Sequence, residues 1–353
     1  MPQNPKSHSI SFLEGDGPLL VIQPLVGIGD MVWHKKWIDS LIADQHVILA
    51  TKMASHPHIL FADSLASDQI LPIERNSRGI KGRHDGLFGL LRLARDFKAT
   101  GAKRALVLHH SQSYIRALRL AGIKAIAAYG FGKVRGVSSA CLAAEDKALH
   151  ATEKMAKFWR LNGWQAPDND WHIGVSEDNH FAARAYLDEM GISPDKLIIL
   201  GIGAMHEDRC WPAMRFAQLV MQLRLERPEM AIALMGGPAE RPIAKAIQSE
   251  ITKAGNAPAL EVFRPLDEAI AILSQAKGYV GNDTSLLNIA AVLGIPSLGL
   301  FSQSAPLTYV PTLHHLDVIA DEDYGQPSVI LQIEVDDVLA GIEAVWPPDN
   351  KTL

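Results

Sequence analysis

The chain has 353 residues, of which 48% are hydrophobic and 21% are charged, a length typical of about two domains. High apolar content with a net charge of −5 excludes a mainly disordered chain, and the mild acidity argues against a general nucleic-acid binder. Cys141 and Cys210 are the two cysteines, too few for a disulfide scaffold or a cysteine-based zinc cluster.

The first half alternates apolar runs of strand length with amphipathic segments of helix length. We expect strands at 18–25, 46–50, 105–108 and 125–129, and helices at 30–43, 87–98, 114–120 and 142–159. A segment rich in Gly, Pro, Asn and Asp follows at 162–179 and predicts a domain boundary. Because strands that alternate with helices pair in parallel, this half predicts a doubly wound sheet.

The same pattern starts again in the second half. Strands are expected at 197–200, 230–235, 260–263, 278–281 and 297–301, and helices at 212–226, 239–254, 266–275, 284–293 and 335–346. The sequence therefore predicts an α/β protein with two Rossmann-like parallel-sheet domains, residues 1–175 and 176–330, facing a central cleft. We expect the helix of 331–353 to pack back towards the first domain. Open parallel sheets bind ligands at the carboxyl ends of their strands.

A glycine loop, Gly27-Ile28-Gly29-Asp30, follows the first expected strand. Glycines let backbone amides approach a ligand, and a helix N-terminus favours negative charge. The loop is not a dinucleotide fingerprint, because Val32 stands where the third glycine belongs, and it is not a P-loop. Asp30 is placed to act as a general base, and the alternative is that it only caps the helix. His34, one turn later, either orients Asp30, contacts substrate or lies in solvent.

Three polar loops follow strands of the second half. Arg209, just before a helix, suits bidentate binding of a diphosphate, or pairs with the acidic residues beside it. Glu240, after a Gly-Gly turn, suits ribose hydroxyls, or stabilises the helix N-terminus. Thr284 and Ser285 with free helix amides form a candidate anion cradle, and the alternative for Asp283 is an N-cap. Together these loops predict a ligand that carries a diphosphate.

No metal site is expected. HExxH and CxxC motifs are absent, and the one D-x-D string, Asp168-Asn169-Asp170, lies in the expected linker, where it indicates a loop. We expect no cofactor either. A leaving diphosphate would then be stabilised by Arg209, hydroxyl groups and helix dipoles.

These loops resemble the heptosyltransferase family of bacterial glycosyltransferases, glycosyltransferase family 9. The resemblance rests on Gly27–Val32 with Trp37, Arg209–Pro212 with Phe216, Gly236–Glu240, Gly281–Thr284 and Ala290–Pro296 with Leu300-Phe301. It implies the GT-B fold and an inverting, metal-independent transfer of heptose from ADP-heptose to the inner core of lipopolysaccharide. It also implies that Asp30 is the base, that Arg209 binds the diphosphate, and that the donor contacts are Gly203, Ala204, Met205, Glu240, Asp283, Thr284, Ser285 and Asn288.

The acceptor would be a lipopolysaccharide core or another lipid-linked glycan. Basic and histidine side chains suit an acidic or phosphorylated acceptor, although each alone is also typical of solvated surface. The candidates are His34, Lys35, His109 and His110, together with Gly29 of the glycine loop. We expect a cytoplasmic monomer that binds no nucleic acid, with peripheral contact at the cytoplasmic face of the inner membrane. We expect neither a signal peptide nor a spanning helix, because residues 1–17 contain no apolar run and no stretch reaches 18 uninterrupted apolar residues.

Some positions differ from the family pattern. Arg209 replaces the usual Lys, Ala204 and Met205 replace small hydroxyl residues, and Ser285 and Asn288 stand where Gly and His are usual. These positions surround the donor's diphosphate and sugar. Two alternative functions therefore stay open at this point: a nucleotide-sugar 2-epimerase-like GT-B enzyme, and a non-catalytic homologue that binds sugar nucleotides.

Overall fold

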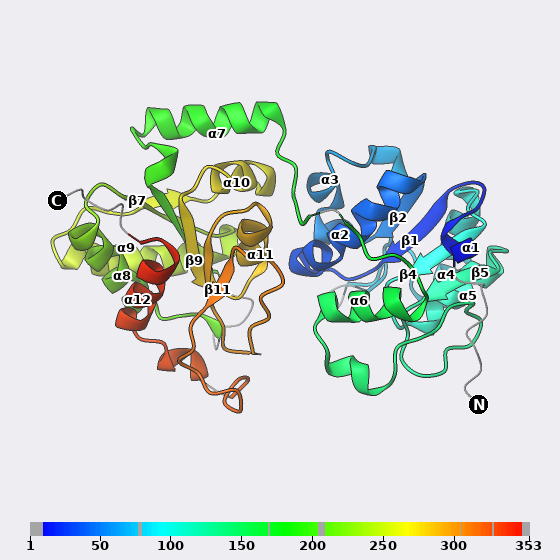
Figure 1. The fold of residues 1–353 in the computed structure, drawn as a ribbon. Coiled ribbons are helices and arrows are strands. Elements are labelled where there is room, and N and C mark those ends of the chain that lie inside the picture. The colour runs from blue at the N-terminus through cyan, green and yellow to red at the C-terminus, as the bar shows by residue number, and fades with distance from the viewer. Residues whose placement is uncertain are drawn as a thin grey trace. The chain divides into compact units, whose positions relative to one another are not determined.

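The computed structural model describes residues 10–76, 80–168, 170–203, 209–303, 305–326 and 328–347. The chain divides into two compact units, residues 1–170 and 171–353, and each unit is built on one parallel sheet (Figure 1). The expected α/β class, with one parallel sheet in each of two units, is confirmed. Within the described part of the chain, no helix combines the length and the apolar composition needed to cross a bilayer.

The first unit has a five-stranded sheet in the order β3-β2-β1-β4-β5. Its strands are β1 (Leu19–Gln23), β2 (Val47–Thr51), β3 (Ile70–Pro72), β4 (Arg104–Val107) and β5 (Ala125–Ala128). Its helices are α1 (Ile10–Leu13), α2 (Ile28–Asp44), α3 (Pro57–Leu60), α4 (Gly86–Ala99), α5 (Gln112–Leu120) and α6 (Ala151–Leu161). The strand order reverses between β1 and β4, and a ligand crevice is expected at such a switch point.

Both faces of this sheet are covered. Leu20 and Ile22 of β1 lie in one core cluster with Leu93 and Phe97 of α4. Because side chains alternate along a strand, Leu19 and Val21, which are also fully buried, point to the other face. Continuous burial of this kind is typical of parallel sheets, and it leaves the carboxyl edge as the place for polar loops.

The helix expected at 142–159 is wrong in its first half. Leu142 pairs with Phe131 in an isolated bridge, a 3-10 turn covers Glu145–Ala148, and α6 begins only at Ala151. The new start is set by a capping box. The side chain of His150 accepts from the backbone N–H of Thr152, and Glu153 Oε2 accepts from the N–H of His150 at 3.0 Å.

The second unit has a six-stranded sheet in the order β11-β10-β9-β6-β7-β8. Its strands are β6 (Leu197–Gly201), β7 (Ala231–Met235), β8 (Leu260–Val262), β9 (Gly278–Asn282), β10 (Ser297–Leu300) and β11 (Leu313–His315). Its helices are α7 (Glu177–Glu189), α8 (Ala213–Glu226), α9 (Arg241–Lys253), α10 (Leu266–Leu273), α11 (Ser285–Val292) and α12 (Val335–Val345). Here the strand order reverses between β6 and β9, so the loops after these two strands flank the switch point.

Helix α12 packs on the core of the second unit. Val338 and Ile342, spaced by one turn, are buried with Phe216 of α8, and Trp346 joins the same core cluster. Helices α12 and α8 lie against each other. The apolar stripe of α12 is therefore satisfied by the sheet and helices that precede it in the chain.

Candidate active site

Asp30 lies in the first turn of α2, directly after the carboxyl end of β1. The helix begins at Ile28, so Gly27 is its N-cap. The Asp30 carboxylate folds back over Gly27 and accepts a hydrogen bond from its backbone, which lowers the pKa, but burial has the larger effect and raises the pKa above its ordinary value of 3.8. Asp30 thus supports the helix start and is also a half-buried carboxylate, as a general base requires.

An imidazole and a phenol lie close to Asp30. His34 Nδ1 is 2.6 Å from the backbone oxygen of Asp30, and its ring stacks on Tyr129 with centroids 6.3 Å apart. Burial raises the pKa of Tyr129 to about 12, and the negative charge of Asp30 acts in the same direction. Tyr129 follows β5, so two loops at this edge of the sheet converge on the carboxylate.

Two further histidines follow β4. His109 and His110 stack with ring centroids 4.4 Å apart, and His109 Nδ1 accepts from the backbone N–H of Ser111. Burial lowers the pKa of His109 to about 4, and the positive charges of His110, Lys52 and His34 add to this effect. The structure therefore brings three of the expected acceptor residues, His34, His109 and His110, to the same edge as Asp30 and Gly29.

Lys35 does not join this group. Its side chain is buried, its Nζ donates to Asp39 Oδ2 at 2.7 Å and lies 3.9 Å from Asp63, and it sits over the ring of Phe61. A buried lysine needs such partners. The expectation that Lys35 contacts the acceptor is thus replaced by a structural ion pair, which holds α2 in its place.

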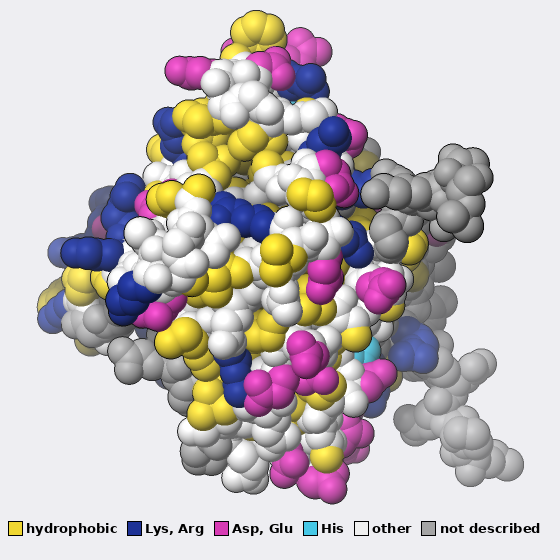
Figure 2. All heavy atoms as spheres, turned by 90° about the vertical axis from the view of Figure 1, so that its left-hand side faces the viewer, with side chains coloured by type: hydrophobic (Ala, Val, Ile, Leu, Met, Phe, Trp, Pro, Cys, Tyr) yellow, Lys and Arg dark blue, Asp and Glu magenta, His cyan; other side chains and the backbone are white. Residues whose placement is uncertain are grey.

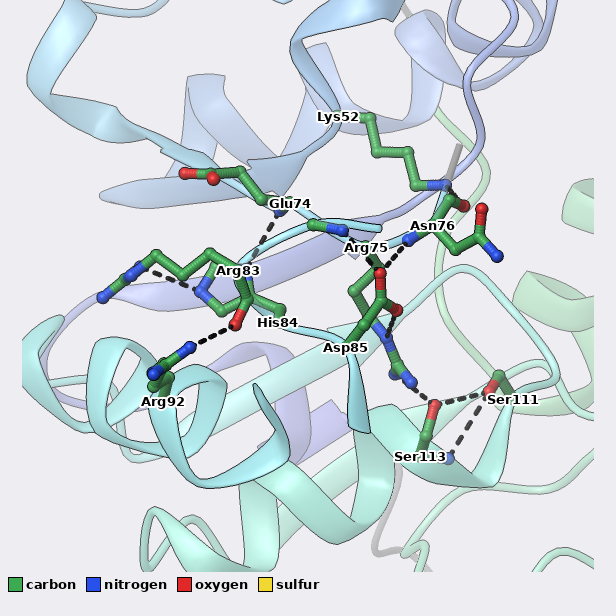
Figure 3. Close-up of polar contacts among 11 residues, drawn as sticks. Lys52, Glu74, Arg75, Asn76, Arg83, His84, Asp85, Arg92, Ser111 and Ser113 are labelled. Atoms are coloured by element: carbon green, nitrogen blue, oxygen red, sulfur yellow. Dashed lines mark hydrogen bonds and ion pairs between the residues drawn. The ribbon is translucent and has the colours of Figure 1, made fainter. Parts of the chain in front are cut away.

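Sequence reasoning missed a cationic cavity at the same edge. The cavity has a volume of about 330 Å³, and His109 is among its lining residues. Figure 3 shows five others, Lys52, Arg75, Asp85, Ser111 and Ser113. Arg75 Nη1 donates to Ser113 Oγ at 2.6 Å, and Arg75 Nε lies 4.0 Å from Asp85. Asp85 itself accepts from the N–H groups of Asn76 and Gly82, so it anchors the segment after β3. Two cations beside the start of α5 suit an anionic group.

The carboxyl edge of the second sheet is organised by Asn282, the last residue of β9, which is fully buried. Its Nδ2 donates to the backbone oxygens of Ile202 and Gly203 at 3.2 and 3.0 Å, and its Oδ1 accepts from the N–H of Trp211 at 3.0 Å. One amide side chain therefore fixes both ends of the loop that carries Arg209.

Arg209 lies beside Asp283, and its positive charge opposes the rise of the Asp283 pKa. Burial has the larger effect and raises that pKa to about 6. The Nε atom of Arg209 is buried, and among the described residues it has no hydrogen-bond partner. An unpaired buried donor costs free energy, so an acceptor on a bound ligand would satisfy this guanidinium.

Glu240 lies across the loop after β6. Its Oε2 accepts from the backbone N–H of Gly237 at 2.7 Å, and a Cβ on Gly203 would lie 3.1 Å from its Cγ. A Cβ on Gly236 would meet the Cβ of Glu240 at 2.9 Å. The glycines thus make room for the Glu240 side chain. Its bond to the Gly237 N–H agrees with the interpretation that Glu240 stabilises the start of the helix.

The start of α11 is open to a ligand. Thr284 is the N-cap, yet its side chain makes no cap hydrogen bond, and the first N–H groups of a helix have no intrahelical acceptor. Ser285 follows as the first helical residue. The Nδ2 of Asn288 donates to Thr284 O at 2.9 Å and its Oδ1 accepts from Tyr309 at 2.6 Å. It positions the N-cap.

Two of the expected donor residues, Ala204 and Met205, lie outside the described residues. Of the rest, Gly203, Arg209, Glu240, Asp283, Thr284 and Ser285 all follow strands of one sheet at its carboxyl edge. In the described ranges, no group of three or more His, Cys, Asp or Glu side chains is arranged to hold a metal ion.

Two parallel-sheet units with polar loops at the carboxyl edges are typical of the GT-B fold. The model of glycosyltransferase family 9 (heptosyltransferase) matches residues 91–332. The chain belongs to this family and is a glycosyltransferase. A comparison with curated proteins gave no match.

Solved structures share the fold along almost the whole chain. E. coli ADP-heptose lipopolysaccharide heptosyltransferase II has 19% identity and a TM-score of 0.68, with 94% of this chain and 98% of that chain covered. A family 9 glycosyltransferase from Veillonella parvula has 18% identity and a TM-score of 0.71, with 93% and 97% covered. The E. coli heptosyltransferase WaaC, solved with ADP-2-deoxy-2-fluoro heptose, has 15% identity and a TM-score of 0.61, with 93% and 99% covered.

Proposed function

We propose that the protein transfers heptose from ADP-heptose to a lipopolysaccharide inner-core or related glycan acceptor, with inversion at the anomeric carbon and without a metal ion. Family membership supports the glycosyltransferase class. The donor is inferred from the names of two relatives, an ADP-heptose lipopolysaccharide heptosyltransferase and an enzyme solved with an ADP-heptose analogue.

The observation that carries the proposal is the burial of Asp30 at the carboxyl edge of the first sheet, which raises its pKa. A carboxylate with a raised pKa is a stronger base. In the proposed reaction it takes the proton of an acceptor hydroxyl, and the oxygen attacks the anomeric carbon of the donor. The bond from that carbon to the diphosphate oxygen breaks, and ADP leaves. A single displacement of this kind inverts the anomeric configuration.

The charge on the leaving diphosphate is proposed to be neutralised by the second unit. Arg209 supplies a buried, unpaired Nε donor, and the start of α11 supplies free N–H groups beside the Thr284 hydroxyl. Glu240 is proposed to accept from ribose hydroxyls through the carboxylate oxygen that does not bind Gly237. With these donors in place, chelators are expected to leave the transfer rate unchanged.

The acceptor is proposed to bind through its acidic groups. The cavity with Lys52 and Arg75 lies at the same carboxyl edge as Asp30, and His109 contributes to its lining. Phosphate or carboxylate groups of an inner-core glycan match these two cations. This assignment extends the acceptor site beyond the histidines that the sequence indicates.

Transfer from ADP-heptose to a heptose-deficient lipopolysaccharide core tests the proposal. Asp30→Asn should lower the rate by about 10³-fold while ADP-heptose binding, measured by calorimetry, stays nearly unchanged. Arg209→Gln should weaken donor binding as well as transfer. Asp44→Asn, at the exposed end of the same helix α2, and Arg184→Gln on α7 are the matched controls.

Three outcomes would contradict the proposal. Near-normal turnover of Asp30→Asn would show that Asp30 is not the base. Loss of activity with EDTA, restored by a divalent cation, would show that transfer needs a metal ion. A product with the donor's anomeric configuration, seen in the coupling constant of its anomeric proton, would rule out a single displacement.

A further inference from the structure

Helix α4 presents large apolar side chains to solvent in its first half. Leu87 is 75% exposed, Phe88 is 74% exposed and Leu91 is 50% exposed. On the opposite side of the helix, Leu93 and Phe97 are fully buried in the core. Leu87, Phe88 and Leu91, the α4 patch from here on, lie on one side of the helix, because Leu91 is four residues from Leu87 and three from Phe88, and residues at these spacings are neighbours on a helix surface. Clustered exposed apolar side chains of this kind mark interaction sites.

The exposed charges of α4 have one sign. Arg92, Arg95 and Lys98 follow the α4 patch along the helix and are all exposed. Asp96 is the one acidic residue of α4, and it is bound by Arg83 and by His84 Nε2, the latter at 2.9 Å. Exposed apolar side chains beside exposed cations suit an anionic membrane surface, because burial of apolar area and attraction to anionic lipids both strengthen binding.

The unit that contains α4 is basic, and the other unit is acidic. Residues 1–170 carry 22 Lys and Arg against 15 Asp and Glu, a formal net charge of +7, whereas residues 171–353 carry 12 against 24, a net charge of −12. The mild overall acidity thus hides a basic first unit. The face drawn in Figure 2 differs from the exposed side of α4, because its apolar side chains are mixed with charges of both signs.

The α4 patch lies next to the cationic cavity. Asp85 is the N-cap of α4, and it also lines the cavity with Lys52 and Arg75, as Figure 3 shows. Leu87 and Phe88 are therefore two and three residues from a wall of the proposed acceptor pocket. If a lipid membrane binds to the α4 patch, the acidic heads of its lipids lie beside that pocket.

We propose that the α4 patch inserts into the headgroup region of an anionic lipid bilayer, with Arg92, Arg95 and Lys98 in contact with lipid phosphates. Three adjacent aliphatic and aromatic side chains favour a bilayer over a nucleic acid, which offers no apolar interior to receive leucines. The inference rests on the proposed function, since it explains how the enzyme meets an acceptor that is anchored in the same bilayer. Hydrophobic insertion and attraction to anionic lipids add together.

Sedimentation of the full chain with vesicles tests the proposal without donor or acceptor. The protein should bind vesicles of phosphatidylcholine with phosphatidylglycerol, bind pure phosphatidylcholine weakly, and lose binding as salt rises. A variant with Leu87→Ser, Phe88→Ser and Leu91→Ser should lower the partition coefficient by about 10-fold or more. The matched control replaces Phe181 and Leu225, which are 76% and 77% exposed in the second unit, with Ser.

The proposal is overturned if the wild type does not bind anionic vesicles, if the α4 variant binds as well as the control, or if duplex DNA competes fully with the vesicles. Transfer to a soluble, delipidated core glycan separates this inference from the proposed function. The α4 variant should keep that activity and lose activity towards acceptor in vesicles. Vesicle binding by a chain with no heptosyl transfer would leave the membrane surface standing and refute the proposed reaction.

Discussion

The Nδ1 atom of His34 lies 2.6 Å from the backbone oxygen of Asp30, one turn earlier in α2. Because a carbonyl oxygen only accepts, Nδ1 carries the proton and Nε2 is left as an acceptor. Nε2 is buried and has no hydrogen-bond partner in the part of the chain that the structure describes. Burial lowers the pKa of His34 to about 4, so the imidazole beside the proposed base is neutral at neutral pH.

This arrangement predicts a loss of stability in acid. The folded-state pKa values of His34 and His109, both about 4, lie below the ordinary 6.5, so the unfolded chain binds these protons first. The stabilising contribution is complete above about pH 6.5 and is lost as the pH falls towards about 4. His34→Phe should remove up to ~3 kcal/mol of this pH dependence, measured by urea unfolding at several pH values.

The exposed His46, replaced by Phe, is the control for that series. The unfolding free energy of His46→Phe should follow that of the wild type across the whole pH range. A His34→Phe profile parallel to the wild type would contradict a neutral, buried His34.

Gly27→Ala should misplace the base without harming the fold. The backbone of Gly27 is extended, with φ −74° and ψ 136°, which alanine adopts freely. A Cβ there would overlap Asp30 Oδ2 and lie 3.2 Å from its carboxyl carbon. We expect transfer to fall by about 10- to 100-fold because the carboxylate is displaced, with donor affinity and melting temperature close to wild type. A wild-type rate would show that the carboxylate position is not critical.

Donor binding should strengthen in mild acid. Burial raises the pKa of Asp283 to about 6, so its carboxylate is ionised above that pH and competes with a diphosphate for Arg209. Protonation below about pH 6 removes the competing charge. Affinity for a nucleotide sugar, whose diphosphate diester does not titrate here, should rise about 5-fold from pH 7.5 to pH 5. In Asp283→Asn the affinity should be high and independent of pH, and a pH dependence unchanged by this substitution would refute the assignment.

Asn282→Ala should destabilise the second unit and the proposed nucleotide site together. The substitution removes two donated bonds and leaves the buried N–H of Trp211 unpaired. We expect a loss of about 2–4 kcal/mol in unfolding free energy and weaker ADP binding. Asn256→Ala, which removes one 3.4 Å bond at the end of α9, is the control and should change neither. Intact ADP affinity in Asn282→Ala would show that the loop is ordered by other contacts.

Much of the fold follows from apolar periodicity, because long buried strands and amphipathic helices leave clear patterns. The strands β3 and β11 were not predicted, since Pro72 ends β3 and β11 has two histidines, His314 and His315, in place of an apolar run. Without β3 there was no reason to place Arg75 at a carboxyl edge, so the cationic cavity was missed with it. The break before α6 was available as a signal, because Glu153 follows His150 at the spacing of a capping box.

Side chains that serve the fold and those that serve a ligand are harder to separate from sequence. Lys35 and Asp39 are one turn apart, and this spacing alone indicates an ion pair. The residues next to Lys35 in the sequence do not show that Phe61 and Asp63 complete the burial of the lysine. Asn288 likewise depends on Tyr309, whose loop comes 21 residues later. Burial by distant segments is a tertiary property, and patterns of neighbouring residues do not encode it.

The indole of Trp211 donates to the backbone oxygen of Ile333, 122 residues further along the chain. Arg215 donates to the same oxygen at 2.7 Å and to that of Leu331. The loop that carries Arg209 is thus buttressed by the segment just before α12. Since a ribosome releases the chain from its N-terminus, the donor loop emerges long before its support. In a nascent chain this loop therefore gains its backbone support only after Ile333 has emerged, when the first sheet, whose last strand ends at Ala128, has long been synthesised.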